Sequence, residues 1–215
     1  MDILEVINSR KSTRAFKPDP VSKDKIEEIL NLVFKAPSAI NLQPWDFVVV
    51  MDEEKQRLSR KLLKSYKEKQ ISCSPGNVKP LSETFSKRGV ESFQLMNPYL
   101  GGQDFNRFVN EGSCNFYGAP VAVIMCLDNA FSKARLVDVG IALGYFVLVA
   151  QNFGLSTCPI GLINAYEDDI KELLDIPDNK DVVIGVALGY EDESNQINQF
   201  RSPRDSLSAF VKWFD

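Results

Sequence analysis

The chain has 215 residues, of which 44% are hydrophobic and 25% charged, and its formal net charge is -4 at pH 7. This is the composition of a globular domain, and its slight acidity argues against nucleic acid as the main partner, because binding to a phosphate backbone needs an excess of Lys and Arg. The sequence contains no His, which excludes imidazole acid–base catalysis, Ser-His and Cys-His nucleophile pairs, and metal sites built on His.

The remaining composition narrows the chemistry further. The four cysteines are widely spaced and form no C-x-x-C motif, so we expect no metal site. The longest apolar run, residues 139–150, is too short to cross a bilayer, and no signal peptide is expected. We therefore predict a cytoplasmic protein with no membrane partner. If it is an enzyme, a bound organic cofactor is expected to carry the chemistry.

The first seventy residues predict three helices and one strand. Residues 2–9 and 22–35 have apolar side chains at helical spacing, and Ser22 is a suitable N-cap. Val21 and Ile26 are placed to form a hydrophobic staple across that cap. The run "DFVVVM" predicts a strand at 46–51, and Asp52 begins a helix that reaches about Lys69. The basic face of that last helix indicates a solvated surface, with steering of an anionic dinucleotide as the less favoured alternative.

Residues 71–110 form the least regular part of the chain. Pro and Gly interrupt the first thirty of these residues, so no helical period persists there. The segment is too rich in aromatic and apolar side chains to be a solvated linker. A stretch of this length in a domain is typical of a lid or a binding loop, so we predict a partly helical lid or dimer arm.

The second half of the chain predicts two buried strands, at 119–127 and 181–190, and a long apolar helix at 132–153 between them. A short helix is predicted at 164–174, with Asn164 and Glu167 at capping-box spacing. The C-terminal tail is expected to dock through its aromatic residues Phe210, Trp213 and Phe214. No linker separates these elements, so residues 1–215 are predicted to form one α+β domain.

Two groups of cations at opposite ends of the chain are candidates for binding a phosphate. The sequence has neither a G-x-G-x-x-G turn after a strand nor a G-x-x-x-x-G-K-[ST] loop, so a Rossmann or P-loop site has no support. Arginine can bind phosphate oxygens in pairs through its planar guanidinium group. Each cluster alone is more typical of surface charge; the clusters are Arg10, Lys11 and Arg14, and Arg201 and Arg204.

Two loops could complete such a site. In "APSAINLQPW", Pro37 and Pro44 restrict the backbone around Ser38 and Asn41, although this pattern alone favours a simple helix stop and strand entry. In "STCPIGLI", a proline and Gly161 leave backbone N–H groups free to approach a flat cofactor closely.

Five motifs taken in order resemble the nitroreductase family of FMN-dependent flavoproteins. Order and spacing fit over nearly the whole chain, with residues 71–110 as the exception. Each motif alone is moderately specific, but five motifs in the family's order are strong evidence for the resemblance. The motifs are "RKSTRAF", "APSAINLQPW", "FYGAPVAVIMCLD", "DVGIALGYFVLVAQNFGL" followed by "CPIG", and "NQFRSPRDSL".

The resemblance implies a three-layer α+β fold, in which helices flank a central, mostly antiparallel sheet, and an intertwined homodimer with two FMN sites. One group of residues would bind the phosphate, ribityl chain and pyrimidine edge of FMN, a second would reach the flavin from the partner subunit, and a third would lie along the isoalloxazine ring. In that order the groups are Arg10, Lys11, Ser12, Arg14, Arg201 and Arg204; Pro37, Ser38 and Asn41; and Pro159, Ile160 and Gly161.

The chain also departs from the family pattern. Some members have a Glu at the position of Gly161, so no carboxylate contact to the flavin is expected there. Asn110 and Asn115 are only candidates for contacting the pyrimidine ring. The aromatic residues of 71–110 fit a flat substrate over the flavin and dimer packing equally well.

The resemblance implies an oxidoreductase that takes hydride from NADH or NADPH through flavin N5 in a ping-pong cycle. The acceptor would be an electron-poor organic oxidant, such as a nitroaromatic or a quinone. A cation near the flavin pyrimidine would stabilise the reduced, anionic form. The alternatives are a dehydrogenase, deiodinase or flavin-destroying member of the same fold, a non-catalytic flavin-binding protein for storage or redox sensing, and a cofactor-free interaction protein. The sequence does not choose between NADH and NADPH.

Overall fold

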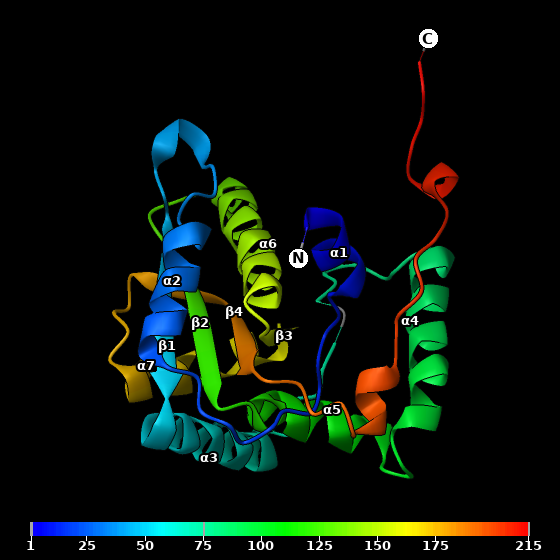
Figure 1. The fold of residues 1–215 in the computed structure, drawn as a ribbon, viewed down its shortest axis with the longest axis horizontal. Coiled ribbons are helices and arrows are strands. Elements are labelled where there is room, and N and C mark those ends of the chain that lie inside the picture. Colours follow the sequence, from blue (N-terminus) through cyan, green and yellow to red (C-terminus); the bar gives the residue numbers. More distant parts are fainter. Residues whose placement is uncertain (1, 75, 215) are drawn as a thin grey trace.

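The computed structural model describes residues 2–74 and 76–214, and its secondary structure follows most of the predicted pattern. Figure 1 shows a sheet with helices on both sides and one helix standing apart. The seven α-helices in this part of the chain are α1 (Ile3–Ser9), α2 (Lys23–Val33), α3 (Asp52–Lys69), α4 (Glu83–Met96), α5 (Phe105–Cys114), α6 (Leu136–Asn152) and α7 (Glu167–Leu174). The four strands are β1 (Trp45–Met51), β2 (Val121–Asp128), β3 (Ser156–Ile160) and β4 (Lys180–Gly189).

The sheet has the strand order β1-β2-β4-β3, and every pair of neighbouring strands is antiparallel. β2 is central, and each of its residues from Val121 to Leu127 is buried, as its unbroken apolar run predicts. A register irregularity between Met125 and Cys126 interrupts its pairing with β4. The predicted antiparallel sheet is therefore confirmed.

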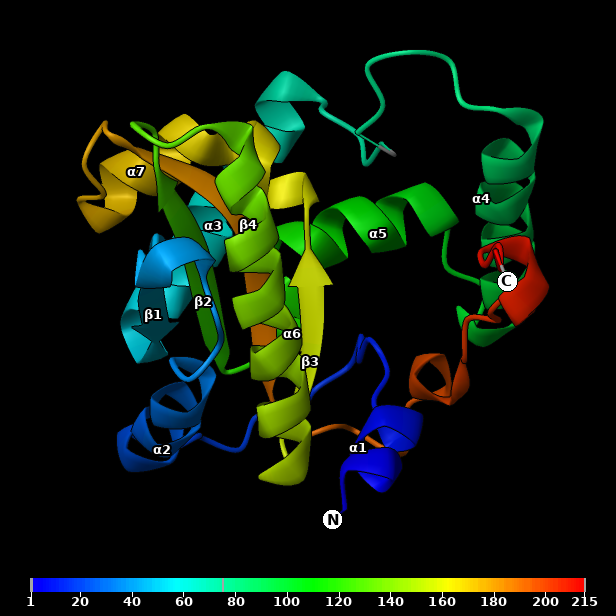
Figure 2. The same ribbon diagram turned by 90° about the horizontal axis from the view of Figure 1, so that it is seen from above.

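Each face of the sheet is covered by its own hydrophobic cluster, because alternate side chains of a strand point to opposite sides. Val123 of β2 packs in the cluster that includes residues of α2 and α6, such as Phe146. Ile124 packs in the other cluster, with Leu58 of α3 and Ile170 of α7. Figure 2 shows α6 running along the sheet with α2 beside it. The predicted three-layer α+β fold is confirmed.

Local sequence signals determine some helix ends and not others. The Ser22 side chain accepts a hydrogen bond from the Lys25 amide at 3.3 Å, so the predicted N-cap of α2 is confirmed. The capping box predicted for α7 is wrong. Asn164 donates to the Val183 carbonyl at 2.5 Å, and the Glu167 carboxylate accepts from the Val182 amide at 3.0 Å. Both side chains bind β4 instead, because tertiary contacts outweigh the local cap.

Residues 71–110 are partly helical, as predicted, and contain α4 and most of α5. Figure 1 shows α4 at one side of the molecule, away from the sheet. Phe85 and Phe93 of α4 are more than half exposed. Arg88 forms an ion pair with Asp205 and lies over the Phe210 ring, and the Phe93 ring lies 4.4 Å from that of Phe105, so α4 contacts both the C-terminal segment and α5.

The C-terminal tail extends away from the body of the molecule in Figure 1. Trp213 is 76% exposed and Phe214 is 90% exposed. Among the residues that the structure describes, the predicted docking of these two side chains is not observed, whereas Phe210 does contact Arg88.

The long apolar helix is longer than its apolar run. A short 3-10 turn and α6 together span Lys133–Asn152, which is long and apolar enough to cross a membrane, so the length argument from 139–150 is wrong. The core helix of a soluble protein passes the same test, and Phe146 and Ala150 of α6 are fully buried against the sheet and α2. The other side of α6 carries exposed apolar residues, including Val137 and Tyr145.

Candidate cofactor site

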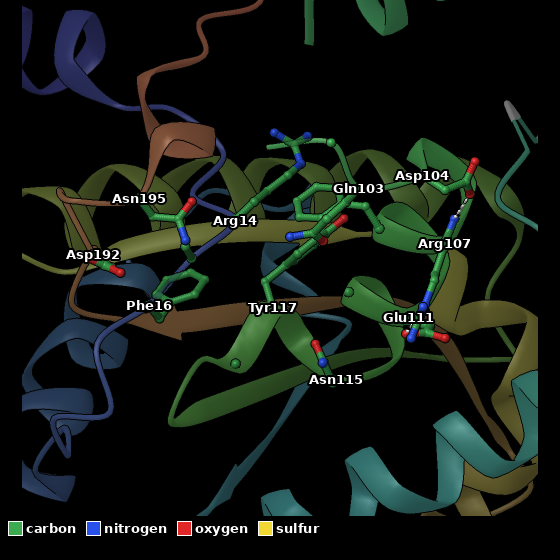
Figure 3. Close-up of a pocket in the computed structure, with 15 residues that line it drawn as sticks. Arg14, Phe16, Gln103, Asp104, Arg107, Glu111, Asn115, Tyr117, Asp192 and Asn195 are labelled. Atoms are coloured by element: carbon green, nitrogen blue, oxygen red, sulfur yellow. Dashed lines mark hydrogen bonds and ion pairs between the residues drawn. The ribbon is translucent and has the colours of Figure 1, made fainter. Parts of the chain in front are cut away.

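Two cavities meet at the Arg14 side chain. The larger, of about 720 Å³, lies between α5 and the segments around Phe16 and Asp192. Figure 3 shows Arg14 beside Gln103 at one end of it and Asn115 at the other. The smaller, of about 590 Å³, is lined by both cationic clusters that the sequence singled out.

The smaller cavity brings together six of the twelve predicted site residues, from segments almost two hundred positions apart. Its other lining residues include Ser92 and Met96 of α4 and Leu148 of α6. The predicted residues that line it are Arg10, Lys11, Ser12, Arg14, Arg201 and Arg204. We call this arrangement the arginine cradle.

Extended backbone at residues 12–16 fixes the N-terminal half of the arginine cradle to the sheet. Ser12 forms a parallel bridge with Thr157 of β3, and the Thr13 amide donates to the Thr157 carbonyl at 3.0 Å. Phe16 forms an antiparallel bridge with Glu191, just beyond β4. The segment thus runs along the sheet edge and is held at both ends.

The charge of the arginine cradle is unbalanced. Burial, followed by the nearby Arg204 and Arg201, lowers the pKa of Arg10. Within residues 2–74 and 76–214, none of these three arginines has a carboxylate partner. Arg201 donates to the Ser9 carbonyl at 2.7 Å, and Arg204 donates to the Ser202 hydroxyl at 2.8 Å. Clustered guanidinium groups that repel one another fit a phosphate dianion, which would satisfy them in pairs.

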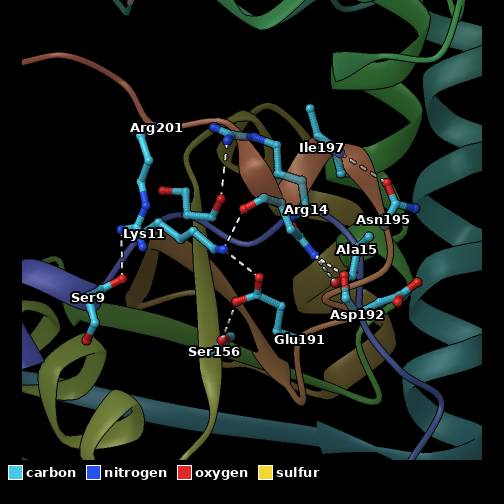
Figure 4. Close-up of polar contacts among 12 residues, drawn as sticks. Ser9, Lys11, Arg14, Ala15, Ser156, Glu191, Asp192, Asn195, Ile197 and Arg201 are labelled. Atoms are coloured by element: carbon cyan, nitrogen blue, oxygen red, sulfur yellow. Dashed lines mark hydrogen bonds and ion pairs between the residues drawn. The ribbon is translucent and has the colours of Figure 1, made fainter.

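Lys11 differs from the arginines, although it lines the same cavity. Its ammonium lies 2.5 Å from the Glu191 carboxylate and 2.5 Å from the Asn198 carbonyl oxygen. Figure 4 shows Lys11 pointing to Glu191, which in turn contacts Ser156. Its charge is therefore already compensated, and the geometry supports a bracing role better than a phosphate contact.

The predicted residues of the "APSAINLQPW" loop lie elsewhere on the subunit. Pro37, Ser38 and Asn41 follow α2, in the loop at the upper left of Figure 1, and none of them lines the cavities described above. The Ser38 hydroxyl accepts from the Gln43 amide at 2.9 Å, and Asn41 has a left-handed φ of 59°. Within one chain, the loop is thus well defined but separate from the arginine cradle.

Pro159, Ile160 and Gly161 continue the sheet edge that supports the arginine cradle. They follow Thr157, the partner of Ser12, along β3 and just beyond its end. Gly161 is exposed, and a Cβ built on it meets no heavy atom within 4 Å. The backbone there can therefore be approached closely by a flat ligand.

The candidate pyrimidine contacts have different surroundings. Asn110 is buried, and its side-chain oxygen accepts from the Cys73 amide at 2.7 Å, which leaves it with a structural role. Asn115 lines the larger cavity, and its buried Oδ1 has no hydrogen-bond partner among the described residues. Sequence reasoning missed Tyr117, which lines the same cavity and whose pKa burial raises to about 12.

The fold and the arginine cradle fit a protein that binds an anionic, phosphate-bearing cofactor. The chain belongs to the nitroreductase family, whose family model matches residues 7–190. It is 32% identical to the 4-nitrobenzoate reductase of Pseudomonas putida, covering 98% of this chain and 94% of the relative. It is 29% identical to nitroreductase NfnB of Mycolicibacterium smegmatis, covering 97% of this chain and 91% of the relative.

The structural comparison agrees with this assignment. The crystal structure of FMN-dependent NfnB from Mycobacterium smegmatis, in complex with NADPH, matches with a TM-score of 0.89 at 27% identity, over 99% of this chain and 97% of that one. NfnB from Sphigopyxis sp. strain HMH matches with a TM-score of 0.91 over the whole of both chains, but at 23% identity this likeness concerns the fold alone.

Proposed function

We propose that this protein uses FMN to reduce a nitroaromatic or similarly electron-poor compound at the expense of NADH or NADPH. The observation that carries the proposal is the set of uncompensated arginines lining one cavity, in a chain of the nitroreductase family. The names of the relatives agree, since two of them are 4-nitrobenzoate reductases and a third is a nitrobenzene nitroreductase.

The residues of the arginine cradle have three distinct tasks in this proposal. Arg10, Arg201 and Arg204 bind the phosphate of FMN, and the neutralisation of their mutual repulsion adds to the binding free energy. Ser12 hydrogen-bonds the ribityl chain. Arg14 lines both cavities, and we assign its guanidinium to the pyrimidine edge.

When bound, FMN supplies hydride transfer through N5, alternately from the nicotinamide and to the acceptor. The chain provides the surroundings of that chemistry. Gly161 presents open backbone just beyond the end of β3, and Arg14 would hold a positive charge near the flavin pyrimidine, where negative charge accumulates on reduction. One shared space for nicotinamide and acceptor would make the cycle ping-pong.

The proposed protein is a homodimer, and each site is completed by the partner. The exposed face of α6 supports this, with Val137 65% exposed and Tyr145 39% exposed. Ile40, in the "APSAINLQPW" loop, is 90% exposed, which is unusual for a residue of its size unless another chain covers it. Dimerisation would bring Pro37, Ser38 and Asn41 of one subunit to the flavin of the other.

Residues 71–110 are proposed to form a lid or dimer arm. Ser92 and Met96 place α4 against the arginine cradle, and its exposed aromatic face is free for a partner chain or a substrate.

A cytoplasmic location stays a prediction.

The test begins with the visible absorption spectrum of the protein purified without added cofactor, and with mass analysis of what heat releases. A flavin spectrum with FMN released is the expected result. Oxidation of NADH and NADPH is then followed with 4-nitrobenzoate as acceptor. Protein that stays colourless after incubation with FMN contradicts the proposal, and FMN binding without turnover by any acceptor indicates a storage or sensing protein instead.

A further inference from the structure

Asn198 uses its whole side chain to join two distant segments of the chain. It lies in the turn Gln196–Gln199 and is 2% exposed. Its Oδ1 accepts from the Arg14 amide at 2.9 Å. Its Nδ2 donates to the carbonyl oxygens of Ala15 at 2.8 Å and of Asp192 at 2.9 Å. A primary amide suits this place because it offers an acceptor and two donors in one plane.

The backbone of Asn198 adds a further contact from the same direction. Its carbonyl oxygen accepts from the Lys11 ammonium at 2.5 Å, and that ammonium also pairs with Glu191. The Asp192 amide in turn donates to the Ala15 carbonyl at 3.1 Å. Asn198 is therefore the centre of a buried polar network between residues 11–15 and 191–198.

The two halves of the arginine cradle depend on this network for their spacing. Residues 10–14 carry one set of cations, and Arg201 and Arg204 follow Asn198 within six positions. Arg201 also ties the two halves by donating to the carbonyl oxygens of Ser9 and Arg10, but Arg201 is exposed and its bonds compete with water. The buried contacts of Asn198 therefore provide the more rigid connection.

We propose that Asn198 is a positioning residue of the FMN site. It fixes the Arg14 backbone and the distance between the two arginine clusters before the cofactor arrives. This inference rests on the proposed function, because it concerns the same site. A site that is already assembled loses less conformational freedom on binding, so preorganisation appears as affinity for the cofactor.

Two substitutions separate this role from simple packing. Asn198→Asp keeps the shape and the acceptor for the Arg14 amide, but it replaces both donors with an oxygen facing two carbonyl oxygens. Asn198→Ser shortens the side chain and leaves room for water, so it carries the test if the first variant does not fold. Gln199→Ala, an exposed position in the same turn, is the matched control.

Three quantities are measured for each protein, at a temperature well below the melting temperature of that protein. These are amide hydrogen exchange of residues 11–15 without FMN, the FMN dissociation constant, and the midpoint potential of the bound flavin. For both Asn198 variants we expect faster exchange at the amides of residues 13–15, FMN binding weakened by about tenfold or more, and a lower potential as Arg14 loses its fixed place. Gln199→Ala should match the wild type in all three.

The outcomes distinguish the inference from the proposed function. If the wild type binds FMN and the Asn198 variants bind it equally well at unchanged potential, Asn198 is only a stabilising residue and the inference is overturned, even if their melting temperatures fall. If the wild type does not bind FMN at all, the proposed function fails and this inference fails with it, whatever the exchange rates show.

Discussion

The ammonium of Lys55 donates to the carbonyl oxygen of Asn115 at 3.1 Å, at the C-terminal end of α5. Lys55 is 3% exposed, and it has no carboxylate partner in the described part of the chain. Burial lowers its pKa from the ordinary 10.5 to about 8. The partial negative charge of the α5 terminus offsets part of this desolvation, and the contact holds the corner that presents Asn115 and Tyr117 to the larger cavity.

This contact predicts a pH dependence of stability. Above about pH 8 the folded protein releases the Lys55 proton, whereas the unfolded chain keeps it until about pH 10.5. The unfolded state thus binds more protons in that window, so the free energy of unfolding gains up to about 3 kcal/mol from this group as pH rises from 8 to 10.5. Lys55→Met should lack this gain.

Urea unfolding at pH 8 and pH 10 measures this gain in the free energy of unfolding. The difference between the wild type and Lys55→Met cancels the titration of tyrosines and cysteines. An equal pH slope in the two proteins would show that Lys55 stays charged in the fold.

Arg204→Ala should separate cofactor affinity from folding stability. Removing one charge-assisted contact to a phosphate costs about 1.5–3 kcal/mol, so FMN binding should weaken about 10- to 100-fold. The stability of the protein without FMN should not fall, because the substitution relieves repulsion with Arg10. An absorbance titration and thermal unfolding without FMN give the two quantities. Unchanged FMN affinity would remove Arg204 from the phosphate site.

Lys11→Met should act mainly on stability. It leaves the Glu191 carboxylate, 20% exposed, without its partner, at a cost of about 1–3 kcal/mol. Adding Glu191→Gln should recover part of this loss, since the remaining group is then neutral. A double-mutant cycle of urea unfolding measures the coupling. Additive losses would show that the two side chains do not interact.

Val137→Asp tests the proposed dimer. An Asp at this exposed position costs little in a single subunit, but it becomes a buried charge if α6 packs against a partner. We expect sedimentation velocity to show a monomer, with FMN affinity lost at the same time because Pro37–Asn41 of the partner are absent. Arg60→Asp, at an exposed position of α3, should leave the dimer intact. A dimer that persists in Val137→Asp would place the interface elsewhere.

Gly189→Ala should destabilise the protein by about 1–3 kcal/mol. The added methyl group would lie 2.5 Å from Cδ of Pro120 and 3.2 Å from Cδ1 of Phe16, where the end of β4 packs against the extended segment 12–16. The proline ring cannot turn aside. Gly89→Ala on α4, where a Cβ meets nothing within 4 Å, should instead be neutral or slightly stabilising. Equal melting temperatures for the two variants would contradict this.

The sequence predicts those elements whose own pattern agrees with their burial. β2 and β4 are unbroken apolar runs in the middle of the sheet, and α3 has one apolar face on the core, so their positions were predicted almost to the residue. β3 was missed because it is short and contains Pro159, which argues against a strand. It is the last strand in the order β1-β2-β4-β3. An edge strand tolerates a proline because the missing N–H can face away from the neighbouring strand.

The site was predictable in composition but not in contacts. The two arginine clusters were found from residue type and spacing, and the structure brings them to one cavity. Lys11 could not be told from its neighbours, because its partner Glu191 lies far away in the sequence. Asn198 had no signal at all, since a single Asn between Ile197 and Gln199 looks like any surface turn. Contacts of this kind depend on the folded arrangement and not on local pattern.

The uncompensated charge of the arginine cradle also has a practical consequence for handling the protein. Any small multivalent anion at millimolar concentration competes for the same guanidinium groups, and added salt screens their pull on a phosphate ester. If FMN binds there as proposed, purification in phosphate or sulfate buffers should release part of it, and the preparation should be less yellow. Purification in a dilute amine buffer from the start should retain the cofactor.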